Sequence, residues 1–473
     1  MDTKKLRQKI LDLAIRGKLV PQDPNDEPAS VLLERIRAEK EQLIKEGKIK
    51  RSKKSVASDT SHYENYELPQ GWAYATMSDI CTKIVDGDHN PPIAQKAESE
   101  YIMISSKNVV NDSIIHLDDV RHLSRADFEL SNARTQVSKG DVLFTSVASL
   151  GRTCIYDLDY PITFQRSVTV ICTKIFNRYL KLFLDSPLYQ NYVGENARGT
   201  AQKGFYINQI SDSWVPIPPL NEQIRIVEKA QSLLDIVQII NYSKEETSNN
   251  IIALKSKILD LAISGKLVRQ DKSDEPAIEL LKRINPQYQP TDNRHYRQLP
   301  DSWQVVKIKD VFTINPKNKV DDDIDAGFVS MSMIDDGYRD SYQFEKKKWS
   351  LIKSGFTHFQ DGDIAVAKIS PCLENRKSMI LKKLPNSIGA GTTELHIFRS
   401  SIVDSKFALY FFKSDYFINQ CIGTFNGAVG QQRVRKNTIE DIEFPLPPYE
   451  EQKRISEKIT HIFECLDKIT AEL

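Results

Sequence analysis

Four polar loops carry the side chains best suited to bind another molecule. They are Val85–Pro92 ("VDGDHNPP"), Asn196–Phe205 ("NARGTAQKGF"), Asn315–Val320 ("NPKNKV") and Phe425–Lys436 ("FNGAVGQQRVRK"). Asn and Gln can form paired hydrogen bonds with adenine, Arg and Lys can do so with guanine, and Gly lets the backbone approach a ligand closely. Taken alone, each loop also fits an ordinary surface turn. A binding role is favoured because "GTAQKGFYINQI" and "AVGQQRVRKNTI" take matching places, each directly before a Pro-Pro pair.

These loops and the segments beside them supply the candidate binding residues. In the first half of the chain they are Lys107, Arg152, Arg198, Gln202 and Lys203. In the second half they are Lys317, Asn318, Lys368, Gln431 and Arg433.

No constellation predicts a catalytic or metal site. "NPPI" (Asn90–Ile93) is similar to the Asn-Pro-Pro-aromatic turn of amino-methyltransferases, but Ile93 cannot stack on a base and no glycine-rich cofactor loop precedes it. Asp335 or Asp340 with Glu345–Lys347 fits a solvated charged loop better than a nuclease site. Gly17-Lys18 lacks the other residues of a phosphate-binding loop, and the eight histidines show no metal spacing.

The composition describes a soluble protein of several domains. A chain of 473 residues is too long for one ordinary core, so two to four domains are expected. No apolar run reaches the roughly 20 residues that span a bilayer, and the N-terminus is too charged for a signal peptide. Six scattered cysteines predict reduced, buried thiols in a cytosolic protein. The net charge of +1 does not by itself favour a nucleic-acid partner, although a local basic patch remains compatible with one.

The chain repeats itself. "ILDLAIRGKLV" at Ile10–Val20 returns as "ILDLAISGKLV" at Ile258–Val268, and "IPPLNEQIRIVEK" at Ile217–Lys229 returns as "LPPYEEQKRISEK" at Leu446–Lys458. Weaker matches join Leu68–Ile80 to Leu299–Val311 and Lys139–Ser146 to Asp361–Lys368. A charged stretch, Ala38–Val56, is extra in the first copy. The order predicts a two-fold internal repeat, in which a variable segment lies between two helical ones.

The repeated segments have the spacing of long helices. Apolar residues recur every three or four positions, at Ile224, Val227, Val237, Ile251, Leu254, Ile258 and Leu261, and at Ile455, Ile459, Ile462, Leu466, Ile469 and Leu473. Asn221 is the predicted N-cap, and Gly17 and Gly265 are predicted helix ends. About 42 residues, Asn221–Ala262, predict one helix, with Asn241–Asn250 as its weakest part. The two chain ends would pack antiparallel against it as a coiled coil; helices on the surface of a globular core are the alternative.

The variable segments predict mixed α/β domains with small sheets. Strands are expected at Ser167–Ile175 and Gly327–Ile334, and helices at Asn177–Val193 and Ser405–Ile422. We therefore predict an α+β protein with a helical segment at 1–50, a first variable domain at 66–215, a central helical region at 216–285, a second variable domain at 296–444 and a C-terminal helix at 445–473. The two domains would be separated by a pair of long antiparallel coiled-coil helices.

The motifs Gly199–Phe205, Pro218–Gln223 and "ILDLAIxGKLV" together resemble the DNA-specificity (S) subunit of type I restriction-modification systems, over essentially the whole chain. The resemblance implies two DNA target-recognition domains, no catalytic activity and no cofactor on this chain. It implies that two methyltransferase (M) subunits supply S-adenosylmethionine and N6-adenine methylation, and that motor-nuclease (R) subunits use ATP and Mg²⁺ for cleavage. Double-stranded DNA would be the ligand, in the cytoplasm and away from membranes. The chain departs from the motif where Phe205 is replaced by Val434 in the second copy.

Two other classes of function stay open at this point. A fused methyltransferase or nuclease would bind a cofactor by itself, and the motifs argue against it. A coiled-coil adaptor that binds only proteins would retain no specific DNA, even together with its partners. The near-neutral charge makes the adaptor the stronger alternative.

Overall fold

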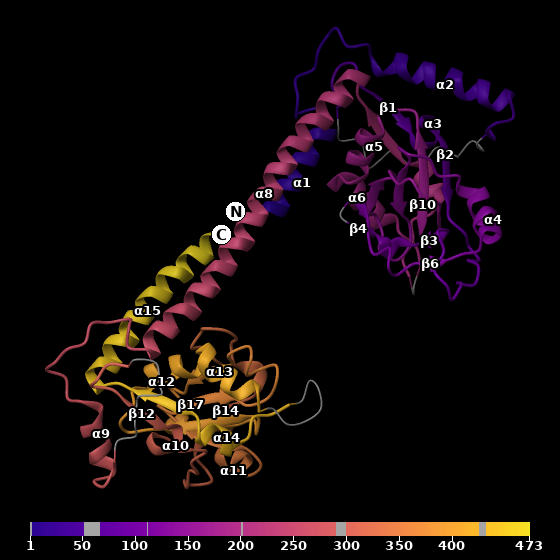
Figure 1. Cartoon of the computed structure of the whole chain (residues 1–473). Coiled ribbons are helices and arrows are strands. Elements are labelled where there is room, and N and C mark those ends of the chain that lie inside the picture. Colours follow the sequence, from indigo (N-terminus) through magenta and orange to yellow (C-terminus); the bar gives the residue numbers. More distant parts are fainter. Residues whose placement is uncertain (1, 52–66, 111, 200–201, 290–298, 425–431) are drawn as a thin grey trace. The chain divides into compact units, whose positions relative to one another are not determined.

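The two copies of the repeat fold into two units of the same build. The computed structural model describes residues 2–51, 67–110, 112–199, 202–289, 299–424 and 432–473. The chain divides into unit 1, Met1–Ser243, and unit 2, Lys244–Leu473. The helices and strands of both units are labelled in Figure 1.

Unit 1 begins with two helices, α1 (Thr3–Ile15) and α2 (Ala29–Lys45). A two-stranded sheet joins β1 (Ala73–Thr76) to β11 (Trp214–Ile217), with the short helix α3 (Met77–Ile80) after β1. A four-stranded sheet follows the order β2 (Cys81–Asp86), β10 (Val168–Thr173), β7 (Val142–Thr145), β8 (Thr153–Ile155). A three-stranded sheet has the order β6 (Arg121–His122), β3 (Ile102–Ile104), β9 (Ile162–Phe164), and β4 (Val109–Val110) pairs with β5 (Ser113–Ile114). The remaining helices are η2 (Ser106–Asn108), α4 (Arg125–Thr135), α5 (Asn177–Leu184), α6 (Pro187–Asn196) and α7 (Ile207–Asp212).

Unit 2 repeats this plan. Its two-stranded sheet pairs β12 (Gln304–Lys307) with β21 (Glu443–Leu446). One four-stranded sheet has the order β13 (Thr313–Ile314), β20 (Leu395–Arg399), β17 (Ile364–Ala367), β18 (Ser378–Ile380). The other has the order β15 (Glu345–Lys348), β14 (Asp325–Val329), β19 (Ile388–Gly391), β16 (Thr357–Gln360). The helices are α9 (Ala277–Ile284), α10 (Ile308–Val311), η4 (Met331–Met333), α11 (Trp349–Ile352), η5 (Pro385–Ser387), α12 (Ser405–Phe412), α13 (Asp415–Ile422), α14 (Lys436–Glu440) and α15 (Tyr449–Glu472).

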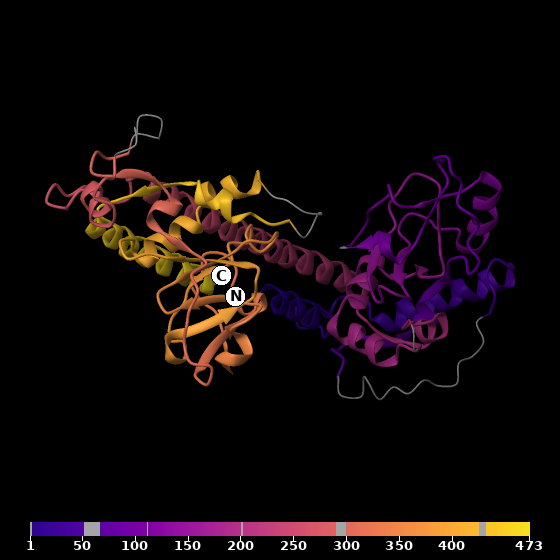
Figure 2. The ribbon, with the colours of Figure 1, turned by 90° about the horizontal axis from the view of Figure 1, so that it is seen from below.

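Helix α8 (Leu220–Ile263) is continuous over 44 residues, so the predicted long helix is confirmed. In unit 1, α1 packs antiparallel to α8, because Thr3 bonds to Asn241 at 2.9 Å while Asp26, after α1, bonds to Arg225. In unit 2, α15 packs antiparallel to α8, with the Lys255 ammonium 2.5 Å from Asp467. Both pairings can be followed in Figures 1 and 2. The predicted α+β class, with its internal repeat and long helical pairs, is confirmed.

Several details differ from the sequence predictions. Ile224 and Leu254 are exposed, since α8 buries Ile226, Val227, Ala230, Leu259 and Ala262 against a broader surface than a two-position coiled-coil seam. Asn221 is not the N-cap; it lies inside the first turn, where its amide bonds to Asp26 at 3.2 Å.

Three of the predicted segments are also divided differently. The strand predicted at Gly327–Ile334 ends at Val329 and continues as η4, and the predicted helices break at Ser186 and Ser414, whose side chains cap α6 and α13.

The predicted burial of the thiols holds for three of the cysteines. Cys81, Cys154 and Cys421 are buried, and burial raises the pKa of each thiol to about 12. Cys465, in contrast, is exposed on α15, so the prediction is wrong there. Among the described residues, no helix is both long and apolar enough to cross a bilayer.

Candidate nucleic-acid interface

In unit 1, a backbone hydrogen bond holds the loop before α7 against the turn between β7 and β8; this bond is called the clamp below. Arg198 and Gly204 exchange backbone hydrogen bonds of 2.9 and 2.8 Å, which close the loop into a small hairpin. The next residue, Phe205, donates its N–H to the Ser146 carbonyl at 2.8 Å. The Phe205 ring is fully buried among Phe144, Tyr189 and Tyr192. The ring therefore anchors the loop, while Arg198, Gln202 and Lys203 stay exposed at its surface.

The other candidates of unit 1 lie on neighbouring loops. Lys107 is on η2, which is tied to the β9–β10 turn because Ser106 N–H donates to the Ser167 hydroxyl at 3.1 Å. Lys107 is exposed and pairs with Asp119 at 2.6 Å. Arg152 is exposed, and its guanidinium reaches the Val109 carbonyl at 3.4 Å. The structure thus brings the unit 1 candidates onto loops that are joined to one another.

A small hollow opens among these loops, with a volume of about 90 Å³. Of the sequence candidates, only Gln202 lines it. The other lining residues were missed from the sequence: Asp86, His89, Ser146, Val147, Arg166, Thr169, Tyr206 and Ile207. His89 lies inside a loop already singled out, and Tyr206 follows the recognised motif directly. Arg166 and Thr169 could not be found by pattern, since only the pairing of β10 with β2 brings β10 and the turn before it beside the hollow.

In unit 2, the same clamp is made with different side chains. Val434 donates its N–H to the Lys368 carbonyl at 3.0 Å, as Phe205 does to Ser146, and Ser370 donates to the Gln432 carbonyl at 2.8 Å. Val434 is 1% exposed. The departure from the motif at Val434 therefore keeps a buried anchor and changes only its shape. Gln431 lies outside the described residues.

The remaining unit 2 candidates differ in how free their side chains are. Arg433 makes two hydrogen bonds, of 2.8 and 2.9 Å, to Glu394, and this guanidinium lowers the pKa of the Glu394 carboxyl. The Asn318 amide donates to the Phe359 carbonyl at 2.8 Å and accepts from Arg399 at 3.3 Å. Lys368 is half-buried, whereas Lys317 is exposed. Of these four, Lys317 is the most available to a ligand.

A buried imidazole joins two of the candidate binding loops of unit 2, those at Asn315 and Val434. His396 lies 3.2 Å from the Val434 carbonyl through Nε2 and 3.3 Å from the Asn315 amide through Nδ1. Burial lowers the pKa of His396 to about 4, so the ring is neutral near pH 7. A neutral ring can donate through Nε2 and accept through Nδ1, which holds the loops at Asn315 and Val434 together.

Comparison with known proteins places the chain in a family. The family model described as "Type I restriction modification DNA specificity domain" matches residues 69–248 and 300–473. The chain belongs to this family. It is 40% identical over 235 residues to the Type I restriction enzyme EcoAI specificity subunit of Escherichia coli, a match of 46% of this chain and 40% of that protein. The EcoEI specificity subunit of Escherichia coli is 38% identical, again over 46% of this chain and 40% of that protein. The chain thus spans well under half the length of these two relatives.

A solved structure shares the fold. It is described as the structural basis of complex assembly and conformational transition of the type I R-M system. The TM-score is 0.57 at 15% identity, and the match covers 86% of this chain and 94% of the other.

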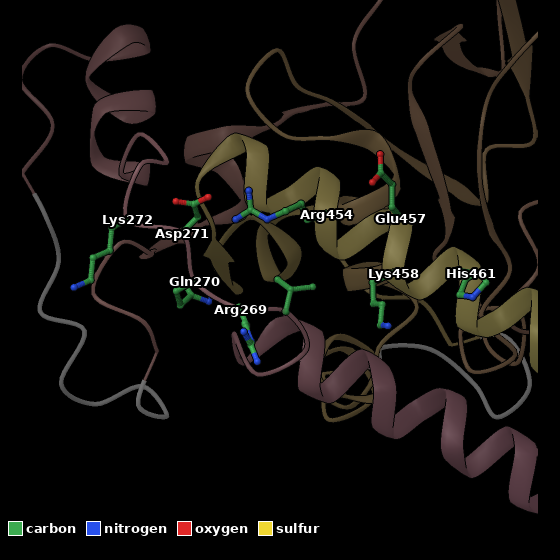
Figure 3. A pocket seen from close by; sticks show the side chains of 9 residues that line it. Arg269, Gln270, Asp271, Lys272, Arg454, Glu457, Lys458 and His461 are labelled. Carbon is green, nitrogen blue, oxygen red and sulfur yellow. The ribbon is translucent and has the colours of Figure 1, made fainter.

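Each segment matched by the specificity-domain model runs from the start of a recognition body into its long helix. The segments outside the match include α1, α2 and the loop between α8 and α9. Unit 2 has a charged hollow of about 630 Å³ there, lined by Val268, Arg269, Gln270, Asp271, Lys272 and, from α15, Arg454, Glu457, Lys458 and His461. Figure 3 shows Glu457 extending from α15 in the opposite direction to Lys458. None of these residues belongs to the candidate binding loops.

The motifs considered for catalysis have structural partners in this specificity-domain fold. Asp335 accepts from the Ser341 hydroxyl, and Asp340 accepts from the Ile380 N–H at 2.8 Å and from Lys382 at 2.6 Å. Asn90 closes a turn with Asp88, and Ile93 is 90% exposed. In the part of the chain that the structure describes, no group of three or more His, Cys, Asp or Glu side chains is placed to hold a metal ion.

Proposed function

We propose that this chain is the DNA sequence-specificity subunit of a type I restriction-modification complex, and that it is itself not catalytic. Its ligand is a bipartite, asymmetric double-stranded DNA site. Partner subunits carry out the N6-adenine methylation and the restriction that this chain directs. Membership of the specificity-domain family and the placement of polar side chains on clamped loops support this proposal.

The observation that carries the proposal is that both units make the same backbone hydrogen bond but place different side chains beside it. The bonds from Phe205 to Ser146 and from Val434 to Lys368 hold equivalent loops in the two units. The side chains beside the clamps differ, since Lys203 and Gly204 of unit 1 stand where unit 2 has Gln432 and Arg433. Because base identity is read through side-chain hydrogen bonds in the major groove, unlike side chains read unlike half-sites.

The long helices act as a spacer that sets the distance between the two half-sites. A helix of 44 residues is about 66 Å long at roughly 1.5 Å per residue. A continuous helix with backbone hydrogen bonds along its whole length resists bending. Its length therefore sets the number of base pairs between the half-sites.

The partners supply the chemistry. Two methyltransferase subunits bind S-adenosylmethionine, and motor-nuclease subunits bind ATP and Mg²⁺, all in the cytoplasm. The net charge of +1 leaves this chain with little general attraction for DNA phosphates, so tight binding needs the partners to close around the duplex.

The test is to map N6-methyladenine in a host genome that carries this gene together with its methyltransferase gene. A two-part motif methylated on both strands is the expected result. A continuous palindrome, or no motif at all, contradicts the proposal. If the assembled complex also retains no specific DNA, the protein is a coiled-coil adaptor that binds only proteins.

A further inference from the structure

The strand pairings show which positions of the two units are equivalent. Each clamp carbonyl comes two residues after a residue that pairs with an internal strand of its sheet, β10 in unit 1 and β20 in unit 2. These pairs are Phe144 with Thr169 and Val366 with His396. Thr169 and His396 are therefore equivalent, and so are the residues at equal distances from them along each chain.

Three residues before each of these positions, the two units differ in charge. Arg166 stands there in unit 1 and Thr393 in unit 2, each exposed on the turn that leads into the internal strand. The two turns are built alike, because Gln165 and Thr392 each donate their N–H to the parallel neighbouring strand, β3 or β14, at 2.9 and 3.0 Å. The same backbone thus carries a cation in unit 1 and a hydroxyl in unit 2.

The loop after the edge strand, β2 or β13, shows the opposite difference. Ile84 and Ile314 pair with equivalent residues of the internal strands. Three residues further on, unit 1 has Gly87 and unit 2 has the exposed Lys317. Unit 1 has no room for a side chain there, since an added Cβ on Gly87 would lie 2.2 Å from the Phe164 carbonyl oxygen. Each unit therefore has a cation at one of these two positions and a small uncharged residue at the other.

The backbone of Arg166 is fixed, whereas its side chain has no partner. Its N–H donates to the Asp88 carbonyl at 2.9 Å, and its carbonyl accepts from the Ser146 hydroxyl at 3.3 Å. Among the residues that the structure describes, none forms an ion pair or a hydrogen bond with the Arg166 guanidinium. The guanidinium is therefore available to a ligand at a well-defined place.

This place adjoins the candidate binding loop before α7. Arg166 lines the hollow of about 90 Å³ together with Gln202 of that loop. The carboxylate that also lines the hollow, Asp86, is already engaged, because it bonds to His89 at 2.6 Å and pairs with Arg134. An exposed cation without a carboxylate partner thus stands beside a side chain that can bond to bases.

We propose that Arg166 is a specificity-determining residue that reads a guanine in the half-site recognised by unit 1, called the first half-site; this inference rests on the proposed function. A guanidinium presents parallel N–H groups that match the O6 and N7 acceptors of guanine in the major groove. Reading a base edge requires donors that are held in register with it, and the backbone bonds of Arg166 provide such support.

The test uses the full chain, expressed with its methyltransferase partner in a host whose N6-methyladenine is mapped. In Arg166→Ala, the preference for guanine over other bases at one position of the first half-site should fall about tenfold, because the paired hydrogen bonds to that base are lost. The second half-site and the gap should not change. Arg166→Lys keeps the charge but loses the planar pair of donors, and it should relax the same position by a smaller factor.

Arg178 provides a matched control. It is exposed on α5, lies outside the candidate binding loops and the hollow, and likewise forms no ion pair with the described residues. Arg178→Ala removes the same charge and should keep the motif. Thermal unfolding should give the same melting temperature for both alanine variants and the unmodified protein, because neither arginine side chain bonds to another described residue.

The outcomes separate the inference from the proposed function. If the unmodified protein yields no bipartite motif, the proposed function itself fails. If it yields one without guanine in either half, or if Arg166→Ala leaves every position unchanged, the inference is overturned while the function stands. A uniform fall in methylation that keeps the motif and is restored by Arg166→Lys indicates a phosphate contact, and it overturns the inference too. A relaxed motif in Arg178→Ala also overturns it, since the effect then does not depend on the place of the arginine.

Discussion

The indole N–H of Trp72 donates a hydrogen bond to the buried carboxylate of Glu222 at 3.0 Å, and the repeat makes the same bond between Trp303 and Glu451 at 3.0 Å. Each carboxylate also accepts from a glutamine of the segment after the preceding helix, Gln22 at 3.2 Å in unit 1 and Gln270 at 2.6 Å in unit 2. One glutamate thus joins three separate segments of its unit. This explains the "NEQ" and "EEQ" that follow the Pro-Pro pairs.

Removing this carboxylate should destabilise unit 1. Glu222→Ala leaves the buried Trp72 N–H without its acceptor, which costs about 1–3 kcal/mol, whereas the Gln22 amide keeps its hydrogen bond to the Gly17 carbonyl at 2.7 Å. Glu222→Gln keeps one acceptor oxygen and should cost less. Calorimetric unfolding of the full chain measures both. Equal costs for the two variants would show that the hydrogen bonds contribute little.

The same glutamate predicts a pH effect of definite sign. Burial raises the pKa of Glu222 above its usual 4.5, so the unfolded chain ionises it more readily and stability falls as pH rises through and above that value. Glu222→Gln cannot ionise, and its cost should therefore be smaller at pH 7 than at pH 4. Asp26 provides the opposite case, because its hydrogen bond from Arg225 lowers its pKa below 3.8. Asp26→Asn should cost most at neutral pH and progressively less as the pH falls below that value.

Gly265 ends α8 in a conformation that other residues avoid. Its φ is +68°, and an added Cβ would lie 2.5 Å from Cδ of Pro300. Gly265→Ala should lower stability by about 1–3 kcal/mol or more, since strain and overlap add. Gly355 has a φ of +81° with nothing within 4 Å, so Gly355→Ala measures the strain alone. Thermal unfolding compares the two, and a Gly265 variant no worse than the Gly355 variant would contradict the overlap.

The features that the sequence predicted best depend on local rules. Gly17 and Gly265 both have positive φ at helix ends, as their place before the repeated Lys-Leu-Val indicates. The motif residue Phe205 was chosen as part of a binding loop, yet its ring is buried, because a motif does not reveal which of its members face the core. Thr169 was missed altogether. Its position depends on strand pairing with Phe144, 25 residues away in the chain, and no local pattern encodes that pairing.

Lys317 and Asn318 are neighbours that should behave differently. Lys317 is exposed, so Lys317→Ala should weaken DNA binding and methylation at the second half-site without changing the melting temperature. The Asn318 amide donates a hydrogen bond to the Phe359 carbonyl, so Asn318→Ala should lower the stability of the fold by about 1 kcal/mol. Binding of duplex DNA by the assembled complex, followed with thermal unfolding of the chain, separates the two effects. A loss of stability in the Lys317 variant would argue against its assignment.

Lengthening α8 should change the gap between the half-sites and nothing else. Residues 238–250 include no buried position, so four residues inserted between Lys244 and Glu245 leave both cores intact. Four residues add about 6 Å, or roughly two base pairs at about 3.4 Å each. The methylation motif should keep the bases of both halves while its gap grows by about that amount. Replacing residues 243–246 with four alanines keeps the length and should keep the gap. A variant that alters the recognised bases and preserves the gap would mean that α8 does not act as the spacer.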